Sequence, residues 1–169
     1  MSEPLLKTGE VVTIPARAAF SAREYFVANL EPRAPVRIAY VLGNFTRWLL
    51  DKQEPGGKAV SVRWYELQRN ASDKLIVQEL GGPESVESTL AAVFYLMEQQ
   101  RAGQAGPMAT NGWGNQFYVR DTAGVLRGVN IHWCDGGWGV EAVSIGRDAE
   151  WPIRDRVFTA ITNAAQRIL

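Results

Sequence analysis

Hydrophobic and polar residues alternate along residues 115–145, and this pattern predicts three antiparallel strands joined by two tight turns. The first turn, DTAG (121–124), suits a three-residue hairpin loop that ends on a glycine in the left-handed region. The second turn contains Asp135 and Gly136, a dipeptide that two-residue hairpin turns favour. A turn at this pair places Trp133 opposite Trp138 in the predicted meander.

The alternation also sorts the side chains of the meander into two faces, because residues two positions apart on a strand point the same way. One face is apolar and is expected to pack against helices; it contains Phe117, Val119, Val129, Ile131, Trp133, Trp138, Val140 and Ala142. The other, which we call the polar face, carries Gln116, Tyr118, Arg120, Leu126, Asn130, His132, Cys134, Glu141 and Val143. Two hypotheses for the polar face stay open: a solvent-exposed surface with cross-strand pairs, and a surface that binds a polar ligand.

Apolar residues recur at helical spacing in other parts of the chain. Pro83 suits the first turn of a helix, and one apolar stripe follows it, which predicts a helix over 83–101. A similar stripe after Trp151 predicts a second helix over 152–168. Ser21 and Glu24 have the spacing of a capping box, which predicts a short helix over 22–29.

Segments rich in β-branched and aromatic residues predict further strands. Gly43 and Asn44 fit a two-residue hairpin turn, so the chain is expected to return as a strand after them. The run LIVQEL (75–80) fits a strand or a helix. Strands are therefore expected at 11–14, 36–42, 45–51 and 59–68.

These elements predict the α+β class, because strands meet through short turns and helices are few. The expected architecture is a curved antiparallel sheet of about seven strands that ends in the meander over 115–145. The two long helices, 83–101 and 152–168, are expected to cover one face of this sheet. The length of 169 residues fits a single domain, 1–169.

The charge composition argues against one class of binding partner, nucleic acids. Lys plus Arg and Asp plus Glu number 18 each, so the formal net charge is zero, which argues against a nucleic-acid binder that relies on counterion release. Two local basic groups are interspersed with acids and are interpreted as solvated surface: Arg63, Arg69 and Lys74, and Arg147, Arg154 and Arg156.

Targeting signals and cysteine usage point to the compartment. The single cysteine cannot form an internal disulfide, and the first residues have neither the basic nor the apolar region of a signal peptide. No apolar run approaches the ~18 residues of a spanning helix. We therefore expect a cytoplasmic protein with no membrane and no nucleic-acid partner.

The stretch HWCDGGWG (132–139) holds the only histidine and the only cysteine of the chain. His132, Cys134 and Asp135 do not form a zinc-binding pattern, so neither a metal nor another cofactor is expected. Catalysis by a Cys134 nucleophile would need His132 as its base. Residues two apart on a strand are ~6–7 Å apart, beyond direct hydrogen-bond reach, so Cys134 is interpreted as a packed side chain.

His132 shares the polar face with Glu141, which lies opposite or diagonal to it depending on the register of the second turn. A carboxylate beside an imidazole orients the ring for proton transfer, with Tyr118 or Asn130 as a hydrogen-bonding partner of the substrate. A structural cross-strand pair explains the same arrangement.

The leading hypothesis is a non-enzymatic binding protein that holds a small polar ligand or a protein partner. The alternatives are a small enzyme that uses His132 and Glu141, and a structural homo-oligomeric subunit, such as a homodimer, that pairs through an exposed edge strand. Trp113, between two glycines in the loop NGWGN (111–115), suits ligand recognition, although a turn that anchors Trp113 in the core is the favoured interpretation. The candidate ligand-binding residues are Gln116, Tyr118, Arg120, Asn130, His132, Glu141 and Trp113.

Overall fold

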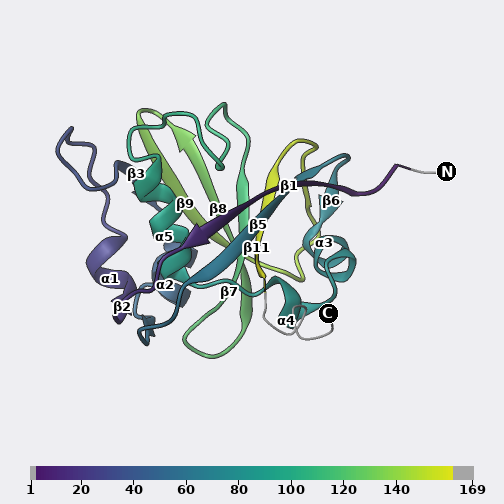
Figure 1. Cartoon of the computed structure of the whole chain (residues 1–169), viewed down its shortest axis with the longest axis horizontal. Helices are drawn as coiled ribbons and strands as arrows, with labels where there is room; N and C mark the ends of the chain where they lie inside the picture. The colour runs from purple at the N-terminus through teal and green to yellow at the C-terminus, as the bar shows by residue number, and fades with distance from the viewer. Residues whose placement is uncertain (1–2, 162–169) are drawn as a thin grey trace.

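The computed structural model describes residues 3–161 and is built on one seven-stranded sheet (Figure 1). Neighbouring strands are antiparallel except at two places, where β11 runs parallel to β7 and β3 runs parallel to β9. The sheet is therefore mixed, and the prediction of an antiparallel sheet is wrong. In spatial order the strands are β1 (Leu6–Ile14), β5 (Val60–Leu67), β11 (Arg156–Ile161), β7 (Asn115–Arg120), β8 (Leu126–Cys134), β9 (Gly137–Ser144) and β3 (Ile38–Val41).

Short helices and two small ribbons surround this sheet. Along residues 3–161, none of the helices is long and apolar enough to cross a membrane. The ribbons pair β2 (Phe20–Ser21) with β4 (Gln53–Glu54) and β6 (Ala71–Ser72) with β10 (Glu150–Trp151). The helices are α1 (Ala22–Tyr25), α2 (Gly43–Leu49), α3 (Asp73–Glu79), α4 (Pro83–Val86) and α5 (Leu90–Gln99).

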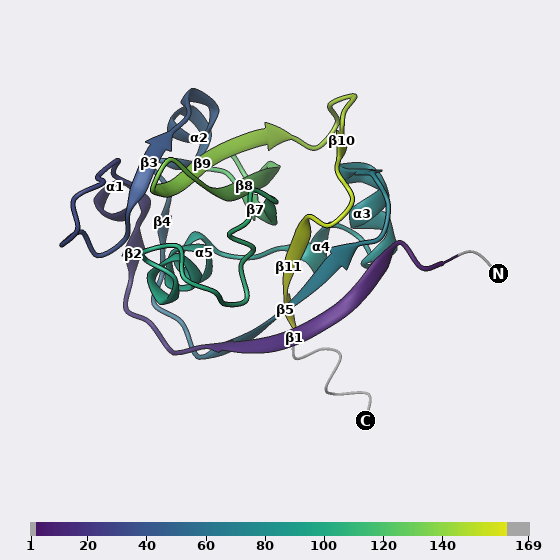
Figure 2. The same cartoon turned by 90° about the horizontal axis from the view of Figure 1, so that it is seen from above.

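The sheet bends around α5, so that β7–β9 lie on one side of this helix and β1 and β5 on the other (Figure 2). The main core fills this concave side and includes Phe94, Phe117 and Phe158. A second core lies on the opposite face, where Ile76 of α3 packs with Tyr118. Helices thus cover both faces, and the prediction that they cover only one is wrong.

The three strands of the meander lie where the alternation predicts them. Trp133 stands opposite Trp138, which identifies Asp135 and Gly136 as the turn. Both turn residues have positive φ angles, 50° and 82°, as a turn of this kind requires. The residues predicted for the apolar face all belong to or pack against the main core.

The predicted hairpin at Gly43 and Asn44 is wrong, because this segment begins helix α2. Phe45 and Leu49 are buried and Trp48 packs beside them, which is the i, i+3, i+4 spacing of a helix. Since the chain turns into a helix here, β3 is left to pair with β9 in parallel.

The predicted helix over 83–101 is interrupted between α4 and α5. Thr89 begins a new helix: its side chain accepts a hydrogen bond from the Ala92 amide at 3.1 Å. The Glu54 carboxylate, from a distant segment, accepts bonds from the next two free amides, those of Leu90 and Ala91, at 2.9 Å each. These partners replace the intrahelical bonds that a continuous helix would have supplied.

The predicted helix over 152–168 is also wrong. Residues 156–161 form strand β11, and residues 162–168 lie outside the part of the chain that the structure describes. Val157 packs in the second core and Phe158 in the main core. A strand buried on both faces has no period of two, so its apolar residues matched a helical stripe instead.

Candidate functional site

One half of the polar face is closed to ligands by α3 and β10. Tyr118 is fully buried, and its hydroxyl donates to Asp73 Oδ1 at 2.9 Å. The Trp151 indole donates to the same oxygen at 2.7 Å. Burial, together with the charge and hydrogen bond of Asp73, raises the pKa of the Tyr118 phenol well above its usual range. This predicted site residue is therefore part of the second core.

Arg120, another predicted site residue, lies at the far end of β7. Its guanidinium donates to Glu87 Oε2 at 3.2 Å and to the Gly124 carbonyl at 3.0 Å. These contacts tie the first hairpin to the segment that follows α4. They separate Arg120 from the other residues proposed for the polar face.

The other half of the polar face contains a row of hydrogen-bonded side chains. Gln116 Nε2 donates to Asn130 Oδ1 at 3.1 Å and to Asp155 Oδ2 at 3.0 Å, and Asn130 Nδ2 donates to Glu141 Oε1 at 2.8 Å. We call Asp155, Gln116, Asn130 and Glu141 the amide row. Ionised carboxylates only accept hydrogen bonds, so the two carboxylates at its ends set the direction of both amides. The structure thus brings three predicted residues together and adds Asp155.

His132 contacts Tyr40 of β3. The Tyr40 side chain crosses Gly139, and its hydroxyl lies 2.5 Å from His132 Nε2. A Cβ atom on Gly139 would come within 2.5 Å of the Tyr40 ring, so a residue without a side chain is needed there. Within residues 3–161, no hydrogen bond or ion pair joins His132 to Glu141, which is bonded to Asn130 instead. His132 Nδ1 is buried and has no partner there.

Tyr40 and Cys134 complete this corner of the sheet. Burial raises the pKa of the Tyr40 phenol to about 12, and the hydrogen bond and charge of Cys134 add to this effect, as do the charges of Glu141 and Asp135. The phenol is therefore protonated at neutral pH. In the described part of the chain, no group of three or more His, Cys, Asp or Glu side chains is arranged to hold a metal ion.

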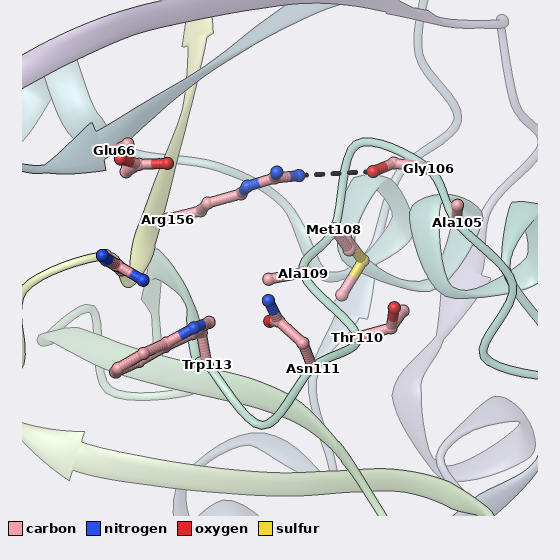
Figure 3. A pocket seen from close by; sticks show the side chains of 10 residues that line it. Glu66, Ala105, Gly106, Met108, Ala109, Thr110, Asn111, Trp113 and Arg156 are labelled. Atoms are coloured by element: carbon pink, nitrogen blue, oxygen red, sulfur yellow. Dashed lines mark hydrogen bonds between the residues drawn. The ribbon is translucent and has the colours of Figure 1, made fainter.

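A pocket of about 480 Å³ lies next to the amide row, between the loop before β7 and the start of β11 (Figure 3). Figure 3 shows Arg156 reaching from β11 toward this loop, with Trp113 and Asn111 on the opposite side of the space. We call it the arginine pocket. Its lining residues are Glu66, Ala105, Gly106, Met108, Ala109, Thr110, Asn111, Trp113, Arg154 and Arg156.

The guanidinium of Arg156 is held in place from two sides. It donates to the carbonyls of Gly106, at 3.2 Å, and Pro107, and it lies over the Trp64 ring at 4.2 Å from the centroid. Burial lowers the pKa of Arg156, and the charge of Glu66 opposes this change. An arginine keeps its charge at neutral pH under such conditions, so the pocket has a fixed cation.

Arg154 is the second cation of the pocket, and its backbone is in an unusual conformation. Its φ angle is 79°, a value that residues other than glycine adopt only at a cost in free energy. Its backbone amide donates to the Leu67 carbonyl at 2.8 Å, which helps to hold this conformation. The Arg154 side chain is exposed and, among residues 3–161, forms no ion pair.

Hydrogen bonds of Asp155, at one end of the amide row, connect the two chain segments that line the pocket. Asp155 Oδ1 accepts a hydrogen bond from the Gly114 amide at 2.8 Å, and the Arg156 amide donates to the Gly114 carbonyl at 3.0 Å. These bonds join the two segments that carry Trp113 and the arginines. Gln116 Oε1 is buried without a partner among residues 3–161, but the other hydrogen bonds of this buried network restrict the local structure, so the row positions the pocket.

Of the predicted ligand-binding residues, only Trp113 lines the arginine pocket. The interpretation of Arg154 and Arg156 as solvated surface does not include this pocket, and Asp155 falls in the predicted helix over 152–168. The sequence does contain a signal: the acid stands between two arginines shortly after Pro152, in a segment that can turn. That signal does not reveal which distant residues complete the pocket.

Comparison with protein-family models, with curated proteins and with solved structures finds no match to this chain.

Proposed function

We propose that this protein is a binding protein that holds a small anionic ligand with a flat ring in the arginine pocket. The observation that carries the proposal is the pair of guanidinium groups, Arg154 and Arg156, beside the indole of Trp113. Guanidinium groups bind carboxylate and phosphate groups through paired hydrogen bonds. An indole offers a flat apolar surface on which a ring stacks.

The charges of the pocket support an anion. Two arginines and one carboxylate, Glu66, line it, so the lining has one excess positive charge. Arg156 uses one of its nitrogens for the loop carbonyls, which leaves other N–H groups for a ligand.

The rigidity of the pocket supports binding by a largely preformed site. Arg156 is held by Trp64 and the loop carbonyls, and Asp155 fixes the segment next to Trp113 through Gly114. A site that is already ordered loses less conformational entropy when it binds its ligand. The positive φ of Arg154 adds support, because backbone strain often accompanies functional sites.

The other two hypotheses have less support. Proton transfer at His132 would run through Tyr40, because Glu141 is bonded to Asn130. Pairing through β1 would have to overcome the bulge between Thr8 and Val11, a feature that protects edge strands from association.

Titration with three ring compounds tests the proposal: benzoate, phenyl phosphate and the uncharged benzamide. The readout is the indole N–H signal of Trp113 in two-dimensional NMR, assigned with Trp113→Phe. We expect both anions to shift this signal to saturation and to bind at least about fivefold more tightly than benzamide. Added salt should weaken the anions more than benzamide, because ions screen an exposed charge.

Two variants that remove the same charge provide the matched comparison. Arg154→Ala should weaken benzoate binding about five- to tenfold, whereas Arg33→Ala, at an exposed arginine outside the pocket, should leave it unchanged. Equal affinities in the two variants, or equal affinities for benzoate and benzamide, would overturn the proposal.

A further inference from the structure

A second pocket lies next to an opening in the sheet between β7 and β11. These strands pair over only two positions, Asn115 with Arg156 and Gln116 with Val157. Beyond them, the carbonyls of Tyr118 and Arg120 accept hydrogen bonds from the Ser88 amide at 2.7 Å and from Lys52 Nζ at 2.5 Å. Groups from outside the sheet thus replace the missing strand pairing.

The space next to this opening has a volume of about 520 Å³. It is a half-open pocket lined by the ends of β1, β5 and β11, by the segment 52–58, by α4 and the segment after it, and by the first turn of α5. Much of its wall is apolar and aliphatic: Ile14, Pro55, Val60, Ala91, Ala92 and Ala160. A ligand here would therefore bury mainly aliphatic surface.

The charged groups around this pocket are balanced. Lys52 lies 3.5 Å from Glu54, and Arg17 forms an ion pair with Glu98 at 2.7 Å. Glu87 is paired with Arg120 at 3.2 Å, outside the pocket lining. The other two charges of the lining, Lys58 and Glu84, are exposed and of opposite sign, and neither forms an ion pair among residues 3–161. The lining thus has no net charge, and water screens the two unpaired groups, so a charged ligand would lose its water for little electrostatic gain.

The lining contains a buried polar group that has no partner among residues 3–161. Ser88 is only 4% exposed, and its hydroxyl makes no hydrogen bond within residues 3–161. Its backbone is held by the bond to Tyr118, so the side chain stays at the pocket wall. A buried hydroxyl without a partner costs free energy, and a ligand that accepts a hydrogen bond from it would remove that cost.

We propose that this pocket is a second binding site, which takes an uncharged and mainly aliphatic ligand with one carbonyl group that accepts a hydrogen bond from Ser88. The site does not depend on the arginine pocket. It differs from that pocket in charge balance and in the polarity of its wall.

The experiment compares three unbranched probes of five carbons each: pentanamide, pentanoate and pentylammonium. Their binding is followed by two-dimensional NMR on the full chain through the backbone amide signals of Ser88, Ala91 and Ala92. We expect pentanamide to shift these signals to saturation and to bind at least about fivefold more tightly than either ion. An order of affinity in which pentanoate or pentylammonium equals pentanamide would overturn the proposal.

Variants test the role of Ser88 and the place of the ligand. Ser88→Ala should weaken pentanamide at least about threefold, while Ser144→Ala, at an exposed serine on β9, should not. Ala18→Phe, at an exposed position of the lining, should fill the space and abolish binding, and it keeps the test valid if Ser88→Ala does not fold. Unchanged affinity in Ser88→Ala or in Ala18→Phe would overturn the proposal, and Arg154→Ala should have no effect.

Discussion

The carboxylate of Asp155 accepts a hydrogen bond from the backbone amide of Gly114 at 2.8 Å and thereby joins the starts of β7 and β11. The two residues are distant in sequence, and each is next to a residue of the arginine pocket, Trp113 or Arg154. Because Asp155 also accepts from Gln116, the same carboxylate connects the pocket to the amide row.

Loss of this carboxylate should destabilise the fold. Asp155→Ala leaves the buried Gly114 amide and one bond of Gln116 without a partner. We expect the free energy of unfolding to fall by about 1–3 kcal/mol in urea titrations at neutral pH. Asp148→Ala, at an exposed aspartate, is the control and should change it by less than about 0.5 kcal/mol.

The Asp155 carboxyl should also make stability depend on pH. Burial raises its pKa above 3.8, and this effect exceeds the opposing effects of the bonds from Gly114 and Gln116 and of the charge of His132. The folded state therefore holds this proton more tightly than the unfolded state. The resulting stabilisation is fully present below pH 3.8 and is lost as the pH rises through the folded-state pKa.

Asp155→Asn removes the titrating carboxyl, so the difference in stability between the native protein and this variant reports the effect of that carboxyl at each pH. Urea unfolding of both proteins at about pH 3, 5 and 7 should give a stability of the native protein, relative to Asp155→Asn, that falls as the pH rises. A relative stability that rises with pH would show that the hydrogen bonds, and not burial, dominate the pKa.

Gly114 should tolerate no side chain. A Cβ atom there would lie 2.7 Å from Asn130 Oδ1 and from Gln116 Nε2, and 2.8 Å from Asp155 Oδ2. These atoms are bonded to one another and cannot move apart without breaking the row. Gly114→Ala should lower the free energy of unfolding by about 1–3 kcal/mol in urea titrations.

Gly146 provides the matched control for this substitution. A Cβ atom on Gly146 would meet nothing within 4 Å, and Gly146→Ala should therefore be nearly neutral. Equal losses of stability in both variants would mean that the crowding at Gly114 is relieved by small movements.

The meander could be predicted from sequence because one of its faces is apolar along its whole length. Phe117, Val129 and Ile131 alternate with polar residues, and a period of two has one structural meaning. Strand β11 has no such pattern, since Val157 and Phe158 pack into different cores. A short apolar run that is buried on both faces cannot be distinguished from a helix by its period.

Some residues of the candidate site could likewise be predicted from the sequence, and others could not. Gln116, Asn130 and Glu141 could be placed on one face because they belong to neighbouring strands of the same meander. Asp155 and Tyr40 reach that face from other parts of the chain, and no local pattern reports such contacts. The register of the second turn determines which residue pairs with Glu141, because it places Asn130, and not His132, opposite Glu141.

The Tyr40 phenol should lose its proton at a higher pH than an ordinary tyrosine. Its pKa is raised to about 12, mainly by burial and then by Cys134 and the negative charge of Glu141. The protonated phenol is favoured by folding, so its contribution to stability is fully present below pH 10 and is lost as the pH rises through about 12. Selective ¹³Cζ labelling of tyrosine should show one signal, absent in Tyr40→Phe, that changes near pH 12.

Glu141→Gln provides the control for this assignment. It removes a nearby negative charge and should lower the pH at which the Tyr40 signal changes. A signal that does not respond to Glu141→Gln would mean that the two groups are too well screened by solvent to interact.

Glu54 should be required for the start of α5. Its two carboxylate oxygens accept from the amides of Leu90 and Ala91, and it is 7% exposed. In Glu54→Gln one oxygen becomes an NH₂ group that faces an N–H donor, and the negative charge near the positive end of the helix is lost. The free energy of unfolding should fall by about 1–3 kcal/mol, and hydrogen exchange of the first α5 amides should become faster. Glu79→Gln, at an exposed glutamate of α3, should change neither, and the same exchange rates in both variants would show that Thr89 alone suffices to begin the helix.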